Sequence, residues 1–78
     1  MVVFEFDEEQ ERVEIHGTSE DLRELSNIIA KQAERIDDHD HLMTPSWAGD
    51  ELSEKLVNKK DKLINHVAIY CWKTIPYD

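Results

Sequence analysis

Two short stretches near the start of the chain alternate between apolar and polar residues. In VVFEFD, Phe4 and Phe6 fall on one side, and in RVEIHG, Val13 and Ile15 do the same. Alternation with a period of two is typical of strands that bury one face. The polar link EEQE between the two stretches is short, so the sequence predicts a β-hairpin that ends at Gly17.

The pattern changes to a helical period over TSEDLRELSNIIAKQAERI, residues 18–36. Thr18 and Asp21 approximate a capping box, in which each side chain bonds the backbone N–H of the other. Lys31 and Arg35 lie near the predicted C-terminal end, where the helix dipole favours positive charge. One apolar stripe at helical spacing indicates that a single side of the helix is buried. Its members are Leu22, Leu25, Ile28, Ile29, Ala33 and Ile36.

Two further strands are predicted in the second half of the chain. HDHLMT, residues 39–44, is stopped by Pro45, and INHVAIYCWK, residues 64–73, is rich in β-branched and aromatic residues. Between them, Asp50 could cap a short helix over residues 51–57, or the segment could form a charged, extended arm. We favour the helix. The predicted order is β-β-α-β-β, an α+β fold with a four-stranded, mainly antiparallel sheet and one long helix packed on one face.

The alternation also predicts which side chains face the helix. They are Phe4, Phe6, Val13, Ile15, Leu42, Val67, Ile69 and Cys71. The opposite face of the sheet should then carry all four histidines beside two large aromatic residues. These outward residues are His16, His39, His41, Met43, His66, Tyr70 and Trp72. An uncovered sheet face is normally polar, whereas this mixture is closer to the composition of a protein interface.

The chain has 78 residues, of which 18 are acidic and 9 are basic, and a net charge of -9. This length predicts one small domain over residues 1–78. An acidic surface disfavours nucleic acid and anionic membranes and suits a basic partner, although acidity also serves solubility. A single cysteine excludes an internal disulfide. The start resembles no signal peptide and no apolar run has the length of a membrane span, so we expect a cytoplasmic protein.

The motif HDH places His39 and His41 on one face of a strand, where both could bind one metal ion with His66 as third ligand. A lone His-x-His is a weak signal, and exposed or hydrogen-bonded histidines are the commoner explanation. We therefore predict no metal and no other cofactor. We also predict no catalytic residue and no enzyme, because Cys71 occupies a core-facing position and Ser46 lacks the glycines of a nucleophile elbow.

Trp47 lies in the loop TPSWAG, between Pro45, which ends a strand, and Gly49, which permits a tight turn. Two explanations stay open for this residue. The indole can fold back to cover the thin core of a small domain, or it can project as an anchor for a partner. Tryptophan is among the residue types most enriched at binding hot spots. Acidic residues flank the loop on both sides.

The strings HLMTPSW and LINHV, with FEFDEEQERVEIHG at the start and IYCW near the end, resemble the immunity protein 32 family. The members of this family are small bacterial proteins encoded beside polymorphic toxins. The resemblance covers nearly the whole chain. It implies an α+β fold, no catalytic activity, and neutralisation of a cognate toxin inside the producing cell. Many such toxins are basic nucleases, which an acidic inhibitor would attract electrostatically.

The residues and the resemblance together predict a binding module that inhibits a cognate toxin domain. The resemblance supplies no set of binding residues, so the predicted site comes from the chemistry of the side chains. It comprises three hot spots and a charged surround: Trp47, His41 and Trp72, with Asp38, Asp40, Asp50 and Glu51. One alternative is a small metal-binding protein that uses His39, His41 and His66. Another is a homodimer that pairs its outward sheet faces without an external target.

Overall fold

The computed structural model describes residues 1–78 and has the predicted α+β fold, with one helix and antiparallel strands. The order of the elements is β-β-α-β-β-β, because a short strand, β4 (Lys62–Leu63), precedes the last one. The strands form two sheets, with the orders β2-β1-β4 and β3-β5. The prediction of one four-stranded sheet is therefore wrong.

The first sheet is built on the predicted hairpin. Its strands β1 (Val3–Asp7) and β2 (Arg12–His16) pair antiparallel, with Phe4 opposite Ile15. In the link between them, Glu11 takes the left-handed backbone conformation, with a φ of 51°. Strand β4 pairs with the other edge of β1 through only two residues, so this sheet stays narrow.

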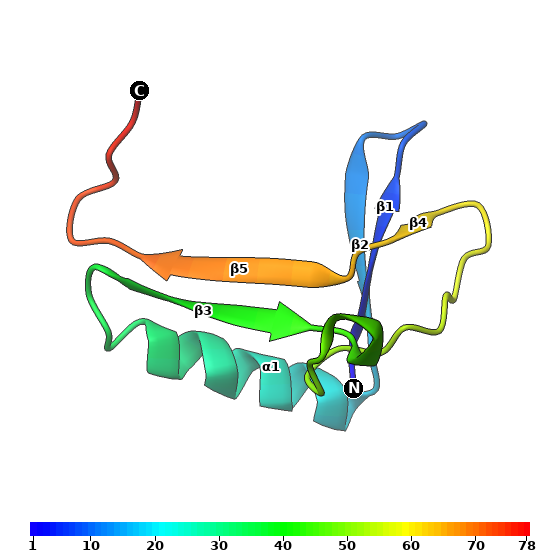
Figure 1. Cartoon of the computed structure of the whole chain (residues 1–78), viewed down its shortest axis with the longest axis horizontal. Helices are drawn as coiled ribbons and strands as arrows, with labels where there is room; N and C mark the ends of the chain where they lie inside the picture. The colour runs from blue at the N-terminus through cyan, green and yellow to red at the C-terminus, as the bar shows by residue number, and fades with distance from the viewer.

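The second sheet consists of β3 (Asp38–Met43) and β5 (His66–Cys71), which pair antiparallel along their whole length. Residues 64–65 explain why the two sheets are separate. At these residues the chain leaves the edge of β1 and turns along β3, so β5 cannot extend the hairpin sheet. Figure 1 shows the result, with β3 and β5 running side by side across the upright hairpin.

The helix α1 (Ser19–Gln32) begins as predicted, at a capping box. The hydroxyl of Thr18 accepts the Asp21 N–H (3.1 Å), and the Asp21 carboxylate accepts the Thr18 N–H (3.0 Å). The N-terminal ammonium group and these bonds to Thr18 lower the pKa of Asp21 to about 2. The helix ends four residues before the predicted end at Ile36. Just beyond it, Asp37 adopts a φ of 60° and donates its N–H to the Cys71 carbonyl (2.8 Å), which turns the chain into β3.

The core lies where the two sheets and the helix meet. Its buried members come from the chain start, both sheets, the helix and the segment after η1: Val2, Phe4, Leu25, Leu42 and Leu52. Val67 and Ile69 pack against it, as the alternation predicted, and the half-buried Cys71 thiol lies 3.8 Å from the Ala33 carbonyl oxygen. Leu52 joins the regions most directly, because it forms a β-bridge with Val2 and is fully buried.

Val13 and Ile15 do not face the helix, contrary to the prediction. They share the side of the hairpin that carries Phe4, but their exposed fractions are 55% and 46%. The reason is the crosswise arrangement of the sheets: α1 packs on β3 and β5 and leaves the outer half of the hairpin uncovered (Figure 1). Large apolar side chains that are exposed outnumber those that are buried.

The predicted helix over residues 51–57 is also wrong. The N–H of Ser53 bonds the Val2 carbonyl (2.8 Å), and the N–H groups of Val57 and Asn58 bond the Glu5 carboxylate. These backbone groups therefore stabilise β1 instead of a helical turn. The one helical turn in this region is the 3-10 helix η1 (Pro45–Trp47). The chain has no helix with the length and apolar content that a crossing of the bilayer requires.

Candidate partner-binding face

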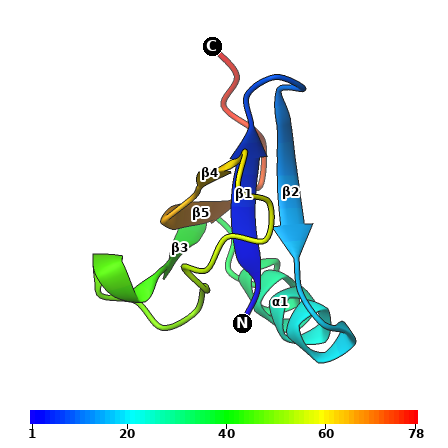
Figure 2. The same cartoon turned by 90° about the vertical axis from the view of Figure 1, so that its right-hand side faces the viewer.

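The outer face of the β3–β5 sheet, the side turned away from α1, presents three histidines of the two strands. His39 lies opposite Tyr70, and His41 lies opposite Ala68 in the antiparallel register. His66 begins β5 on the same face. The predicted outward set is thus confirmed for these strands. In Figure 2, the short helical turn η1 projects from the end of β3, away from α1. The ring of Trp47, in this turn, lies 6.0 Å from that of His66, so η1 brings Trp47 to this face.

Six rings on this face follow one another without a gap, and we call them the aromatic ladder. In spatial order they are Trp47, His66, His41, His39, Tyr70 and Trp72. Successive ring centroids are 6.0, 4.8, 4.8, 4.9 and 6.0 Å apart. Aromatic rings attract one another at such separations. The ladder therefore joins a loop to both strands and ends in a tryptophan on each side.

Two contacts fix the orientation of rings inside the ladder. Nδ1 of His41 lies 2.6 Å from Nε2 of His66, so one imidazole donates a hydrogen bond to the other. The His39 ring stacks on Tyr70 with an interplanar angle of 18°, and Tyr70 stacks on Trp72 with an angle of 6°. Side chains that are already ordered lose less conformational entropy when a partner binds. The ladder is therefore a preorganised surface.

Trp47 is 54% exposed and lies outside the core, so it does not fold back to cover it. Its loop is held tightly. Ala48 takes the left-handed conformation, with a φ of 65°, and the N–H of Gly49 bonds the Thr44 carbonyl (3.0 Å). A Cβ atom on Gly49 would collide with the carbonyl oxygen of Met43, which is why glycine is needed there. The tight turn predicted from TPSWAG thus fixes the position of Trp47.

The predicted acidic residues do not all lie beside the ladder. Asp38 and Asp40 alternate to the opposite side of β3 from His39 and His41. The His39 N–H and then the Arg35 guanidinium, whose Nη2 lies 2.6 Å from the carboxylate, lower the pKa of Asp38. Glu51 accepts the N–H of the neighbouring Asp50 (2.6 Å).

Glu51 also lines a small pocket with Leu25 and Leu42, on the core side of β3. Of the predicted residues, the structure thus brings Trp47, His41 and Trp72 into one ladder. It places Asp38, Asp40 and Glu51 elsewhere. The ladder also contains His39, His66 and Tyr70, which the predicted binding set did not include although the period-two alternation had placed all three on the outward face.

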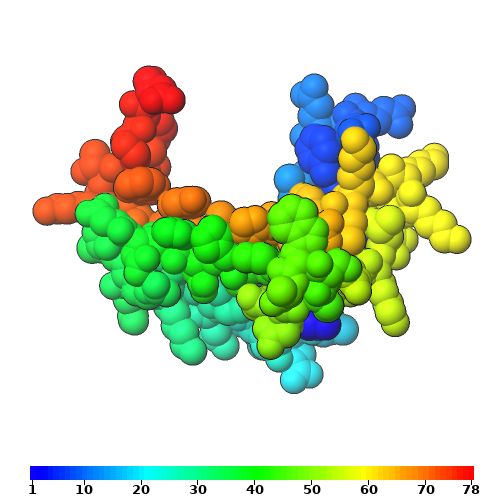
Figure 3. Space-filling model, viewed as in Figure 1, coloured from blue at the N-terminus to red at the C-terminus, as the bar shows by residue number.

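An apolar groove runs beside one end of the ladder. It lies between the C-terminal half of α1 and the end of β5, and seven of its eight lining residues are hydrophobic. Tyr70 and Trp72 line it together with Ile29 and Ile75. Strand β5 pairs only with β3, so its other edge has no strand partner. Figure 3 shows the molecule hollowed above β5, between the C-terminal segment and the β1–β2 hairpin.

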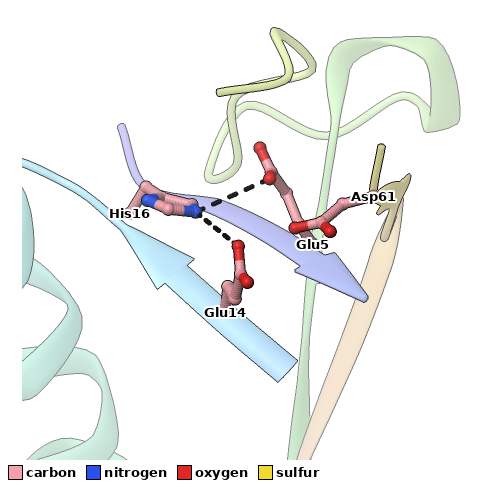
Figure 4. A group of neighbouring side chains, drawn as sticks. All are labelled: Glu5, Glu14, His16 and Asp61. Atoms are coloured by element: carbon pink, nitrogen blue, oxygen red, sulfur yellow. Dashed lines mark hydrogen bonds and ion pairs between the residues drawn. The ribbon is translucent and has the colours of Figure 1, made fainter. Parts of the chain in front are cut away.

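His16 is separate from the other three histidines, so the prediction that all four share one face is wrong. It lies on β2 in the other sheet, where Nε2 is 3.1 Å from Glu14 and 3.5 Å from Glu5. Asp61 approaches the same point (Figure 4). These four residues form a convergent group of potential metal ligands, whereas His39, His41 and His66 lie along the line of the ladder.

We call Glu5, Glu14, His16 and Asp61 the second cluster, in which neighbouring side chains shift the pKa values of Asp61 and Glu14. Burial, and then the neighbouring Glu14 and Glu5 carboxyl groups, raise the pKa of Asp61 to about 6. Hydrogen bonding from Asp61 and then from His16 lowers the pKa of Glu14. The raised pKa of Asp61 and the lowered pKa of Glu14 share one cause, because protonated Asp61 donates a hydrogen bond to the ionised Glu14 carboxylate. No spacing in the chain predicts this group, because Glu5 and Asp61 lie far from the Glu14–His16 pair and carboxylates are abundant.

The chain is thus a small α+β domain with an exposed run of aromatic rings on one sheet face. Residues 12–67 match the family model of Immunity protein 32, so the chain belongs to this family. The predicted resemblance is confirmed, over a range that includes His41 and Trp47 and leaves out Glu5 and Trp72. No curated protein and no solved structure matches the chain.

Proposed function

We propose that this protein neutralises a cognate bacterial toxin by binding it through the aromatic ladder. The single observation that carries the proposal is the exposed, ordered run of rings from Trp47 to Trp72. Membership of the Immunity protein 32 family supports a toxin as the partner. The protein acts as an inhibitor and not as an enzyme, in the cytoplasm of the cell that makes the toxin.

The two ends of the ladder are the strongest candidates for hot spots. Trp47 and Trp72 are 54% and 45% exposed, and both are large and rigid. Tryptophan anchors of this kind contribute on the order of 2–4 kcal/mol each when a partner buries them. His41 lies between them, hydrogen-bonded to His66, and presents polar atoms to the partner. The apolar groove beside Trp72 extends the surface that a toxin could bury.

The charge of the protein selects a basic partner. Its net charge of -9 produces an attractive field for a positively charged toxin, such as a basic nuclease, and raises the association rate. Asp50 is exposed and lies three residues after Trp47. Asp38, Asp40 and Glu51 contribute through the long-range field, because they do not line the ladder. The acidic link between β1 and β2 forms the top of one wall of the hollow in Figure 3.

Co-expression with the toxin encoded beside this gene tests the proposal. Wild-type protein should restore growth, and the double variant Trp47→Ala, Trp72→Ala should not, while remaining folded and soluble. Val57→Ala is a matched control, since Val57 is 62% exposed and lies in the segment that covers the other sheet. Lack of rescue by the wild type, with both proteins soluble, would rule out this function.

A homodimer is the second candidate, because exposed large apolar side chains outnumber buried ones. Two copies could bury the aromatic ladder or the groove beside Trp72 against each other. Sedimentation at micromolar concentration separates the two functions. We expect a monomer whose sedimenting mass increases only when toxin is added, and only when Trp47 is present. A stable dimer that dissociates in the Trp47→Ala, Trp72→Ala variant would favour the second candidate instead.

A further inference from the structure

The second cluster, Glu5, Glu14, His16 and Asp61, contains a buried charge that the protein alone does not satisfy. The Asp61 side chain points into the cluster (Figure 4), and the residue is only 6% exposed. Both of its carboxylate oxygens are buried and have no hydrogen-bond donor. A buried carboxylate is costly without a compensating charge or donor. Glu5, at 0% exposure, adds a second buried carboxylate at the same place.

The geometry brings one ligand atom from each residue toward a common point. The four atoms lie within 4.8 Å of one another. They come from both strands of the hairpin and from the residue just before β4. In a tetrahedral site with bonds of about 2 Å, ligand atoms are about 3.3 Å apart, so small side-chain movements would complete the coordination.

Two of the ligands are already oriented by contacts outside the cluster. The Glu5 carboxylate accepts the N–H groups of Val57 (2.6 Å) and Asn58 (3.2 Å). The Glu14 carboxylate accepts a hydrogen bond from Nη2 of Arg12 (3.0 Å). Contacts of this kind fix ligand geometry in metal sites and strengthen binding of the ion. Arg12 reaches only Glu14 and Asp7, so it does not compensate Asp61.

We propose that Glu5, Glu14, His16 and Asp61 bind one divalent first-row transition-metal ion, Zn²⁺ or Mn²⁺. Three carboxylates and one imidazole suit these ions, whereas Ca²⁺ and Mg²⁺ prefer ligand sets made of oxygen alone. The ion would supply the positive charge that compensates the buried Asp61 carboxylate. It would also tie β1, β2 and the start of β4 together, which a narrow sheet in a domain with a thin core needs.

The test is a titration of the metal-stripped full chain with Zn²⁺ and with Mn²⁺, followed by calorimetry and thermal melts. We expect one ion per chain and a higher melting temperature on binding. Asp61→Asn should weaken binding at least about tenfold. Asp50→Asn is the matched control, since it removes the same charge from an exposed position and should bind normally. If Asp61→Asn does not fold, Glu14→Gln takes its place, because its side chain lies nearer the surface.

A second pair of variants locates the ion. His16→Gln should weaken binding, and His41→Gln should leave it unchanged, because His41 belongs to the aromatic ladder. Three results would overturn the proposal: no saturable binding of either ion to the wild type, unchanged binding in Asp61→Asn, or loss of binding in His41→Gln. The first would mean that the carboxyl groups share a proton instead, and the last would assign the ion to the ladder. None of these outcomes bears on rescue from the toxin.

Discussion

The two sheets of this protein differ in the chemistry and the solvent exposure of one face. On the β2-β1-β4 sheet, one face carries ionisable side chains, including Glu5 and Asp61, and the segment around Val57 and Asn58 covers it. On the β3–β5 sheet, the outer face carries an aromatic ladder, and the chain leaves it open.

This arrangement is the reverse of what burial energetics alone would favour. Aromatic surface stabilises a fold when it is buried, and carboxylates are least costly when they stay in water. A chain with a thin core nevertheless leaves both tryptophans about half exposed. We attribute the difference to the two proposed sites: the open face would bind a protein partner, and the covered one would hold an ion that also stabilises its sheet. The following predictions test this contrast, from the largest effect to the smallest.

The largest effect is expected at Leu52, which is fully buried where the two sheets meet. Leu52→Ala should lower the free energy of unfolding by about 2–5 kcal/mol, through lost burial and a cavity. Because the two sheets share this core, both should unfold in one transition. Urea titration followed by tryptophan fluorescence and by far-ultraviolet circular dichroism checks this. Separate midpoints for the two signals would show that the sheets are independent units.

Gly49→Ala should destabilise the loop that carries Trp47. The added Cβ meets the Met43 backbone, which cannot move without disturbing β3, so we expect a loss of about 1–3 kcal/mol. Gly17→Ala is the control. Its Cβ meets side-chain atoms, at 2.9 Å from Cγ1 of Val2 and 3.0 Å from Cβ of Asp21, so the loss should be smaller. An equal or larger loss at Gly17 in denaturant titrations would contradict this account of the loop.

The pH dependence of stability should report on Asp61 in the presence of a chelator. Burial and the facing Glu14 and Glu5 carboxyls raise its pKa from 3.8 to about 6, so the folded protein holds the proton more tightly than the unfolded chain. The resulting stability is full below about pH 3.8 and is lost as the pH rises through about 6.

Thermal melts of the wild type and of Asp61→Asn at pH 5 and pH 7.5 check this sign. The neutral amide mimics the protonated acid. The variant should therefore melt higher than the wild type at pH 7.5, with a smaller difference at pH 5. A wild type that gains stability relative to the variant as the pH rises would contradict the raised pKa.

Much of the fold follows from local patterns. The helix start was predictable because the capping box of Thr18 and Asp21 is a short-range feature. The faces of β3 and β5 were predictable because alternation is fixed by backbone geometry within each strand: Leu42 points inward, while His39 and His41 point outward. The alternation placed five of the six ladder residues on the outward face, namely His39, His41, His66, Tyr70 and Trp72, whereas Trp47 was predicted from its loop.

The arrangement of the strands was not predictable from such patterns. Strand β4 has two residues and leaves almost no periodic signal, yet it occupies the edge of β1, and the turn after it leaves β5 paired with β3 alone. The alternation of β2 correctly places His16 on the side opposite to Ile15, but β2 belongs to the β2-β1-β4 sheet, away from the other three histidines. The metal-ligand cluster depends on Asp61 lying beside Glu5 and Glu14, and this contact depends on long-range packing. A single signal was available: Glu5 is a charged residue between Phe4 and Phe6 in a strand that is otherwise mostly apolar.

The smallest effect on stability should occur in the aromatic ladder. Trp47→Ala should change the free energy of unfolding of the free protein by less than about 1 kcal/mol, because the indole is half exposed and lies outside the core. Urea titration measures this directly. A loss as large as that expected for Leu52→Ala would mean that Trp47 serves the fold and not a partner.

The affinity of the Trp47→Ala variant for the toxin encoded beside this gene tests the central claim most directly. Isothermal calorimetry should compare wild type, Trp47→Ala and the exposed control Val57→Ala under the same salt conditions. Loss of about 2–4 kcal/mol of binding energy corresponds to a dissociation constant roughly 30 to 1,000 times weaker for Trp47→Ala. Val57→Ala should bind like the wild type. Wild-type affinity in the folded Trp47→Ala variant would contradict the account, because the toxin would then bind elsewhere on the molecule.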